Sequence, residues 1–94
     1  MNLQFEWDPR KARSNLKKHR VSFEEAGTVF DDTLFITFLD DEHSIYEERY
    51  ITIGLSKMNH LLLIAHTDRK GKIRIISARK ATHNEQKFYE EEAL

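Results

Sequence analysis

The stretch HLLLIAHTDRKGKIRIISARK, from His60 to Lys80, contains two apolar runs separated by a turn. Leu61 to Ala65 would be apolar on both faces of a strand, which is typical of a central strand covered on each side. The turn Arg69-Lys70-Gly71-Lys72 suits a tight hairpin, because Gly71 supplies the positive φ that such turns need. Lys72 to Ala78 then returns as a second strand. The pattern predicts an antiparallel hairpin at the centre of a sheet.

Two further strands are expected before this hairpin. Leu34 to Leu39 is rich in β-branched and aromatic residues, and an acidic turn at Asp40 to Glu42 separates it from a strand at Tyr46 to Leu55. With a short strand within Leu3 to Trp7, the chain would form a meander of about four antiparallel strands and one short N-terminal strand.

Three capping signals predict helices. Asp8-Pro9 places a carboxylate at an N-cap and proline at the first helical position of a helix that runs to about Lys18. Ser22 with Glu25, and Thr82 with Glu85, have the spacing of capping boxes. The expected fold is therefore α+β, one domain over residues 1–94, with two N-terminal helices and one C-terminal helix on a single sheet.

Composition excludes several classes of protein. The 94 residues contain no cysteine, so disulfides and thiol chemistry are ruled out. No glycine-rich phosphate loop and no tight histidine cluster occurs, so we expect neither a nucleotide cofactor nor a metal. No apolar run approaches a membrane span, and the opening lacks a signal peptide's apolar segment, so we expect a cytoplasmic protein without membrane contact.

Charge is segregated along the chain although the net charge is only −1. Residues 1–20 carry six basic and two acidic residues, residues 21–48 carry nine acidic and no basic ones, and residues 57–87 carry eight basic and two acidic ones. If the two basic blocks meet on one face, that face would attract phosphates and the natural partner is nucleic acid. The alternative is an ordinary solvated surface with compensating ion pairs.

The candidate functional residues are cations near strand ends. Strand alternation places Arg74 and Lys80 on one face and Arg79 on the other, and Arg49 shares the face of Ile51 and Ile53. The structural alternative for Arg49 and Arg79 is an ion pair with Glu47, Glu48 or Glu85. For His19, a capping role at the helix C-terminus is the alternative to catalysis.

These residue types suffice for RNA cleavage without metal. That reaction needs a base for the 2′-hydroxyl proton, cations for the charge of the phosphorane and an acid for the leaving 5′-oxygen. Arginines supply the charge stabilisation, and histidine, glutamate or lysine can transfer the protons.

The chain resembles the BrnT toxins of bacterial type II toxin–antitoxin modules. The resemblance lies in FEWDPRKARSNLKKHRVSFEEAGTVFDD (residues 5–32), EERYITIGLS (residues 47–56) and IRIISARKAT (residues 73–82), followed by Asn84-Glu85 and Tyr89. It implies a RelE-like ribonuclease fold and metal-independent RNA cleavage that halts translation. It also implies neutralisation by a dimeric BrnA antitoxin, whose ribbon-helix-helix part binds operator DNA, in a heterotetramer.

The same resemblance marks His19, Arg49, Arg79 and Lys80 as catalytic candidates, and we expect Trp7, Lys18, Arg69 and Arg74 to contact RNA. Three departures from the family stand out: Arg20 replaces a usual glycine, Asn59-His60 replaces Gly-Arg, and His83 replaces a frequent arginine. The last two departures remove basic groups and therefore affect how tightly the substrate could be bound.

Two other classes of function remain open. A non-catalytic module would use the same basic face to bind nucleic acid or the antitoxin. A purely structural subunit would have Arg49 and Arg79 satisfied internally by carboxylates.

Overall fold

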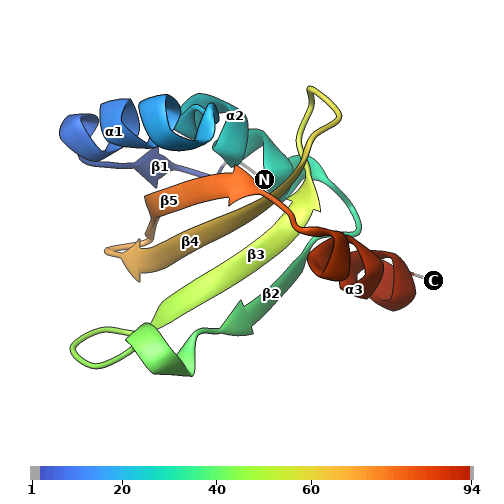
Figure 1. Ribbon diagram of the computed structural model, residues 1–94. Helices are drawn as coiled ribbons and strands as arrows, with labels where there is room; N and C mark the ends of the chain where they lie inside the picture. Colours follow the sequence, from blue (N-terminus) through green and yellow to red (C-terminus); the bar gives the residue numbers. More distant parts are fainter. Residues whose placement is uncertain (1–2, 94) are drawn as a thin grey trace.

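The computed structural model describes residues 3–93 and consists of one five-stranded sheet with helices on one face and at one end (Figure 1). The elements are β1 (Phe5–Glu6), α1 (Pro9–His19), α2 (Phe23–Thr28), η1 (Val29–Asp31), β2 (Ile36–Leu39), η2 (Asp41–His43), β3 (Arg49–Leu55), β4 (Leu61–Arg69), β5 (Lys72–Lys80) and α3 (His83–Ala93). This is the predicted α+β fold. None of these helices combines the length and apolar character needed to cross a membrane.

The sheet has one strand more than the four of the predicted meander, in the order β1-β5-β4-β3-β2. The extra strand is β1, which pairs parallel to β5, with Phe5 opposite Ile73. The backbone N–H of Ile73 donates to the carbonyl of Gln4 at 2.9 Å. The remaining pairs are antiparallel, as predicted.

The β4–β5 hairpin turns where the sequence predicted. Lys70 and Gly71 have φ values of 53° and 80°. Two consecutive residues with positive φ form a type I′ β-turn, whose twist matches the right-handed twist of the flanking strands.

The predicted helix starts are also present, with one difference. Asp8 accepts a hydrogen bond from the N–H of Arg10 at 2.8 Å. Thr82 and Glu85 form the full reciprocal capping box, with distances of 3.2 and 2.8 Å. Ser22 Oγ accepts from the N–H of Glu25 at 3.0 Å, but the carboxylate of Glu25 turns away to other partners, so that capping box is only half formed.

Helix α1 lies along the part of β5 that β1 leaves unpaired. Its buried residue Asn15 donates to the carbonyl of Ala78 at 2.8 Å and accepts from the N–H of Ala78 at 3.1 Å. The side-chain amide thus makes the two bonds that a neighbouring strand would make. These bonds satisfy the backbone N–H and C=O of Ala78, which would otherwise be unpaired at the edge of β5.

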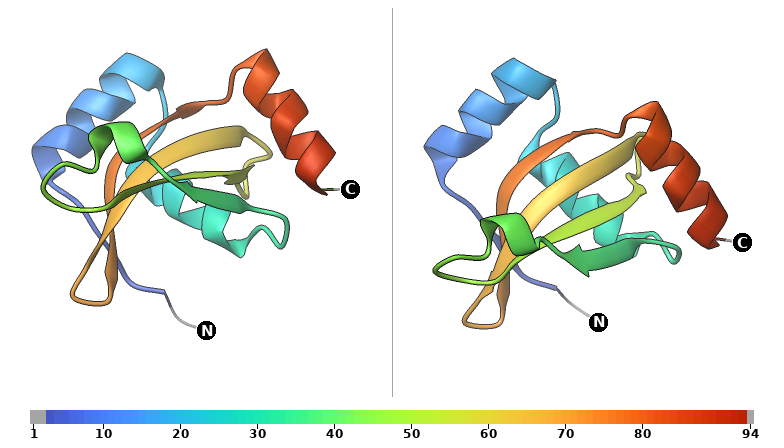
Figure 2. Two further views of the ribbon diagram at one scale, coloured as in Figure 1. Left: turned by 90° about the horizontal axis from the view of Figure 1, so that it is seen from below. Right: turned by 60° about the horizontal axis from the view of Figure 1, so that its bottom comes forward.

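The core lies between the sheet and helices α1 and α2, which cover one face in Figures 1 and 2. Its fully buried members come from both layers: Val21, Phe23, Ala26, Val29, Leu62, Ile64, Ile75 and Ala78. The opposite face, called the open face below, carries α3 at one end only. That face is where the candidate arginines lie.

A register shift decides which side chains reach the open face. Between β4 and β5 the pairing shifts at Ala65/His66, so that His66 pairs with Ile75 and Ala65 with Ser77, leaving Ile76 as an extra residue. Alternation is therefore reversed beyond this bulge. The prediction that Arg74 and Arg79 face opposite ways is wrong, because directly paired residues share a face and both pair with open-face residues of β4.

Candidate functional site

A row of side chains crosses the open face where β3 begins and β4 ends. Arg49 pairs with Thr67, and Thr67 pairs with Arg74 on the other side. Arg69 shares this face, two residues beyond Thr67. The structure thus brings three predicted site residues to one end of the sheet. Arg74 donates to the carboxylate of Glu6 at 2.8 Å, so its charge is partly compensated.

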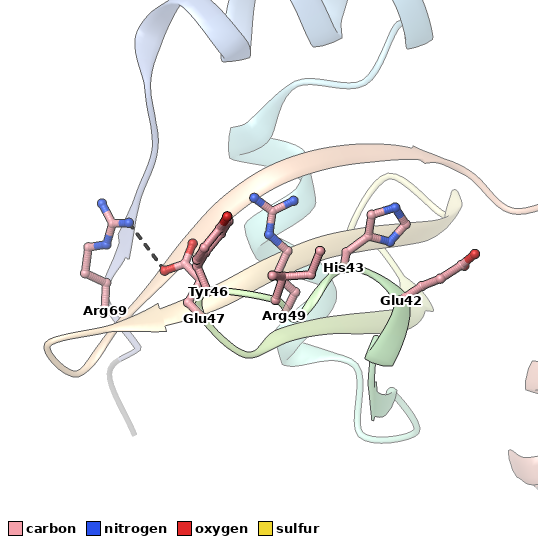
Figure 3. Close-up of a pocket in the computed structure, with 7 residues that line it drawn as sticks. Glu42, His43, Tyr46, Glu47, Arg49 and Arg69 are labelled. Atoms are coloured by element: carbon pink, nitrogen blue, oxygen red, sulfur yellow. Dashed lines mark hydrogen bonds and ion pairs between the residues drawn. The ribbon is translucent and has the colours of Figure 1, made fainter.

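A cavity of about 440 Å³ surrounds Arg49 (Figure 3). Its lining comes from the segment before β3 and the end of β4: Glu42, His43, Ile45, Tyr46, Glu47, Arg49 and Arg69. Arg69 contacts Glu47 at 3.5 Å across an exposed surface. No carboxylate lies within ion-pair distance of Arg49 among residues 3–93. Its charge is available to a ligand in this cavity.

His43 is a site candidate that sequence reasoning missed. Its Nδ1 lies 2.9 Å from Oδ2 of Asp40, and it lines the same cavity as Arg49. A carboxylate bound at one ring nitrogen fixes the orientation of an imidazole and leaves the other nitrogen free for proton transfer. The signal in the sequence was the segment Asp40 to Arg49, where histidine, tyrosine and carboxylates stand together just before an arginine.

The segment from Asp40 to His43 also contains side chains that could bind a cation. Asp40, Glu42 and His43 each offer a ligand atom, and these atoms lie within 4.8 Å of one another. Oxygen and imidazole ligands of this kind suit several divalent ions. Glu42 and His43 are exposed, and Asp40 is already bonded to His43, which makes hydrogen bonding a sufficient account of the arrangement.

Arg79 lies elsewhere on the open face and is paired. Its guanidinium donates to both carboxylate oxygens of Glu85, at 2.8 and 2.9 Å. This hydrogen bonding raises the pKa of Arg79 and lowers that of Glu85. Arg79 pairs with Leu63, four residues along β4 from Thr67, or roughly 13 Å from the Arg49 row. The two arginines therefore do not form one cluster.

Lys18 and His19 lie at the end of α1, next to β5 and away from the Arg49 row. They line a groove of about 190 Å³ with Lys11 and Ser14 of α1 and Ser77 of β5. No side-chain hydrogen bond of His19 occurs among residues 3–93. The helix ends instead through Arg20, whose N–H donates to the carbonyl of Leu16 at 2.9 Å. Lys80 is exposed and pairs with Leu62, a residue of the covered face.

Trp7 lies on the covered side of the sheet. Its ring meets that of Phe23 edge to face at 5.8 Å, and it packs against the buried core. It lines a third cavity with Phe5, Gly27 and Asp31, away from the arginines. The structure thus separates Trp7 from the other residues expected to contact RNA.

The Asn59-His60 departure has a local structural explanation at each of its two residues. His60 Nδ1 lies 2.7 Å from the carboxylate of Glu25, which is 8% exposed and also accepts from Ser56 at 2.7 Å. His60 is therefore turned to an internal carboxylate. Asn59, at φ 63°, adopts the left-handed conformation that glycine favours and asparagine tolerates. This position serves the turn.

Comparisons with known proteins identify the family. No match was found among curated proteins. A search of solved structures gives the Brucella abortus ribonuclease toxin BrnT, with a TM-score of 0.68 and 18% identity over 87% of this chain and 100% of that chain, a likeness that establishes the fold. The model of the BrnT ribonuclease toxins of type II toxin–antitoxin systems matches residues 7–85. This chain belongs to the BrnT toxin family.

Proposed function

We propose that this chain is a metal-independent endoribonuclease whose RNA cleavage halts translation and which a BrnA-type antitoxin neutralises. The observation that carries the proposal is the cavity on the open face, where Arg49 lies beside the oriented His43 and the carboxylate of Glu47. Family membership supports ribonuclease activity and an antitoxin partner.

The proposed reaction is attack by a ribose 2′-oxygen on the adjacent phosphorus. A base removes the 2′-hydroxyl proton as the new P–O bond forms, and the phosphorane carries additional negative charge. The bond to the 5′-oxygen then breaks, and an acid protonates that oxygen. The products are a 2′,3′-cyclic phosphate and a 5′-hydroxyl end.

The residues of the cavity match these requirements. Arg49 would stabilise the phosphorane with its guanidinium, because no carboxylate of residues 3–93 pairs with it. His43, held through Nδ1 by Asp40, and Glu47 are the groups available for proton transfer. Arg69 and Arg74, which share the open face with Arg49, would bind neighbouring phosphates.

The other candidates have more remote roles in this proposal. Lys18 and His19, with Lys11, form a basic groove along α1 that would hold a further phosphate of the RNA. Arg79 and Lys80 would contact only a part of the RNA that extends beyond this groove. Trp7 lies on the covered side of the sheet and would contact only RNA or antitoxin that passes around the sheet edge. An acidic antitoxin segment laid over Arg49 and Arg69 would compete with RNA, and a dimeric antitoxin would give a heterotetramer.

The decisive experiment is cleavage of a defined RNA by the purified chain in excess EDTA, with analysis of the new ends. We expect full activity, a 2′,3′-cyclic phosphate and a 5′-hydroxyl. Activity that returns only with a divalent ion, or products with a 5′-phosphate, would favour metal chemistry at Asp40, Glu42 and His43 instead.

Substitution of His43 separates catalysis from binding. His43→Gln should lower cleavage about a hundredfold or more if it transfers a proton. His83→Gln, which alters an exposed histidine at the start of α3, is the matched control and should leave the rate at saturating RNA unchanged, because position 83 bears on substrate binding and not on proton transfer. Equal rates for both variants would remove His43 from the mechanism.

A non-catalytic binding module is the second candidate. It is favoured by the pairing of Arg79 with Glu85 and of Arg74 with Glu6, because paired arginines are less available to stabilise the charge of a transition state. Expression without antitoxin distinguishes the two. A ribonuclease toxin arrests the growth of its host, and a binding module is tolerated.

A further inference from the structure

The outer edge of β2 has no partner strand among residues 3–93. β2 is the last strand in the sheet order, and Figure 1 shows no described element beyond it. The N–H of Asp40 donates to the carbonyl of Arg49 at 2.8 Å, which fixes the alternation of bonds to β3. Ile36 and Phe38 therefore bond to β3, and the backbone groups of Thr37 and Leu39 point away from the sheet.

This edge is also the most apolar exposed region of the described chain. Six of the eleven exposed large apolar residues lie between Leu34 and Tyr46. They are Leu34, Phe35, Phe38 and Leu39 in or next to β2, and Ile45 and Tyr46, which also line the Arg49 cavity. The ring of Phe38 meets that of Phe88 on α3 at 6.2 Å, so the apolar surface continues onto that helix. An exposed apolar edge strand is a template for pairing with another chain.

The acidic residues on both sides of β2 indicate which kind of partner would bind there. Asp31 and Asp32 precede β2, and Asp40 to Glu42 follow it. Lys57 pairs with Asp31 at 3.3 Å and His43 bonds to Asp40, whereas Asp32, Asp41 and Glu42 form no ion pair among the described residues. RNA does not suit this strand edge, because it has no alternating backbone N–H and C=O groups to complete the hydrogen bonds of a sheet and no apolar side chains to cover Phe38 and Leu39. A second copy of β2 would place acids against acids in either strand orientation. A segment with apolar and basic residues matches both properties.

We propose that an extended segment of the antitoxin, with alternating apolar and basic residues, adds to the outer edge of β2 as a sixth strand. This inference rests on the proposed antitoxin partner. It concerns the backbone edge of β2, which adjoins the open face at Phe38, and a segment distinct from the acidic one proposed to cover Arg49 and Arg69. Backbone bonds to Thr37 and Leu39 would supply affinity, and the acidic flanks would set the preference for a basic segment.

Hydrogen exchange measured by NMR on the isotope-labelled toxin tests the pairing directly. The probe is the purified antitoxin encoded beside the toxin. In the complex, exchange of the Thr37 and Leu39 amides should slow at least about tenfold, while Ile36 and Phe38 are already protected by β3. A complex in which those two amides exchange as fast as in the free toxin would overturn the proposal.

Two substitutions test the same contact through affinity. Leu39→Pro removes an outward N–H at an edge position where proline is tolerated, and Leu39→Lys adds a charge that repels a basic segment. Each should weaken antitoxin binding about tenfold or more. Leu16→Lys on α1, at a position 49% exposed compared with 40% for Leu39, should change it less than about twofold. Equal affinities for the Leu39 and Leu16 variants would contradict the proposal.

The outcomes for this surface and for the ribonuclease site are independent. Free Leu39→Lys toxin should cleave RNA at the unsubstituted rate, because Leu39 has no part in the proposed chemistry. Absence of cleavage by the unsubstituted toxin would reject the proposed function without affecting the exchange result. Protection of Thr37 and Leu39 by RNA, or by self-association at high concentration, would assign the edge to a different occupant and overturn the antitoxin proposal.

Discussion

Arg79 donates two hydrogen bonds to the carboxylate of Glu85, which also accepts the backbone N–H of Thr82. One carboxylate thereby joins the end of β5 to the first turn of α3. The geometry gives Arg79 a structural function, whereas Arg49 has no such partner among the described residues.

The two arginines should therefore respond differently to truncation. Arg79→Ala should lower the free energy of unfolding by about 1 kcal/mol, a value reduced by solvent screening because the arginine side chain is 38% exposed. Arg49→Ala should leave stability unchanged and lower RNA cleavage by about a hundredfold. Urea denaturation and cleavage rates on both variants give the comparison. A large stability loss in Arg49→Ala with normal cleavage would reverse these assignments.

Arg20 occupies a backbone conformation that suits glycine. It ends α1 with φ 61° and ψ 27°, in the left-handed region where a side chain is disfavoured. Arg20→Gly should raise the free energy of unfolding by about 0.5 to 1 kcal/mol. Arg13→Gly, at an exposed position inside the same helix, should lower it by about 1 kcal/mol. Thermal unfolding of the pair measures both effects, and destabilisation by Arg20→Gly would show that its side chain makes a compensating contact.

Gly54 in β3 leaves no room for a side chain. A Cβ there would lie 2.6 Å from Cγ1 of Val29 and 3.0 Å from Cβ of Phe35. Gly54→Ala should therefore destabilise the protein by about 1 to 3 kcal/mol. At Gly27 in α2 the nearest atom would be 3.5 Å away, so Gly27→Ala should stabilise the helix by about 0.5 to 1 kcal/mol. Chemical denaturation that ranks the two variants in the opposite order would refute this account.

Local patterns were sufficient to predict most of the fold. The capping residues Asp8 and Thr82, and the Lys70-Gly71 turn, act through bonds to residues nearby in sequence, so their spacing alone identifies them. The pairing of β1 with β5 depends on residues almost seventy positions apart, and no local signal encodes it. The same holds for Asn15, whose bonds replace those of a missing neighbour strand.

The candidate site was less predictable for a specific reason. Strand alternation assigns faces correctly only while the register is regular, and the bulge at Ile76 reverses it between Arg74 and Arg79. His43 was missed as a candidate because its case depends on a bond to Asp40 and on a cavity shared with Arg49, which residue type alone does not reveal. The charge blocks were a partial guide: Arg69 and Arg74 of the open face come from the second basic block, but Arg49 lies outside both blocks. Lys18 of the first block lies on α1 in a separate groove.

His66 should make stability depend on pH between about 4 and 6.5. It is 7% exposed, bonded through Nε2 to Thr52 at 2.7 Å and stacked on Tyr50, and its burial lowers its pKa to about 4 from an ordinary 6.5. Above pH 6.5 the imidazole is neutral in both the folded and unfolded chain. As the pH falls below 6.5 the unfolded chain binds a proton that the folded chain does not, so the free energy of unfolding should decrease by about 3 kcal/mol by pH 4 and then stop changing on account of this group. Urea denaturation at half-unit pH steps should show this slope in the unsubstituted protein and in His83→Gln, and His66→Gln should remove it. A slope that survives in His66→Gln would mean that another group titrates in this range and that His66 is not the origin of the pH dependence.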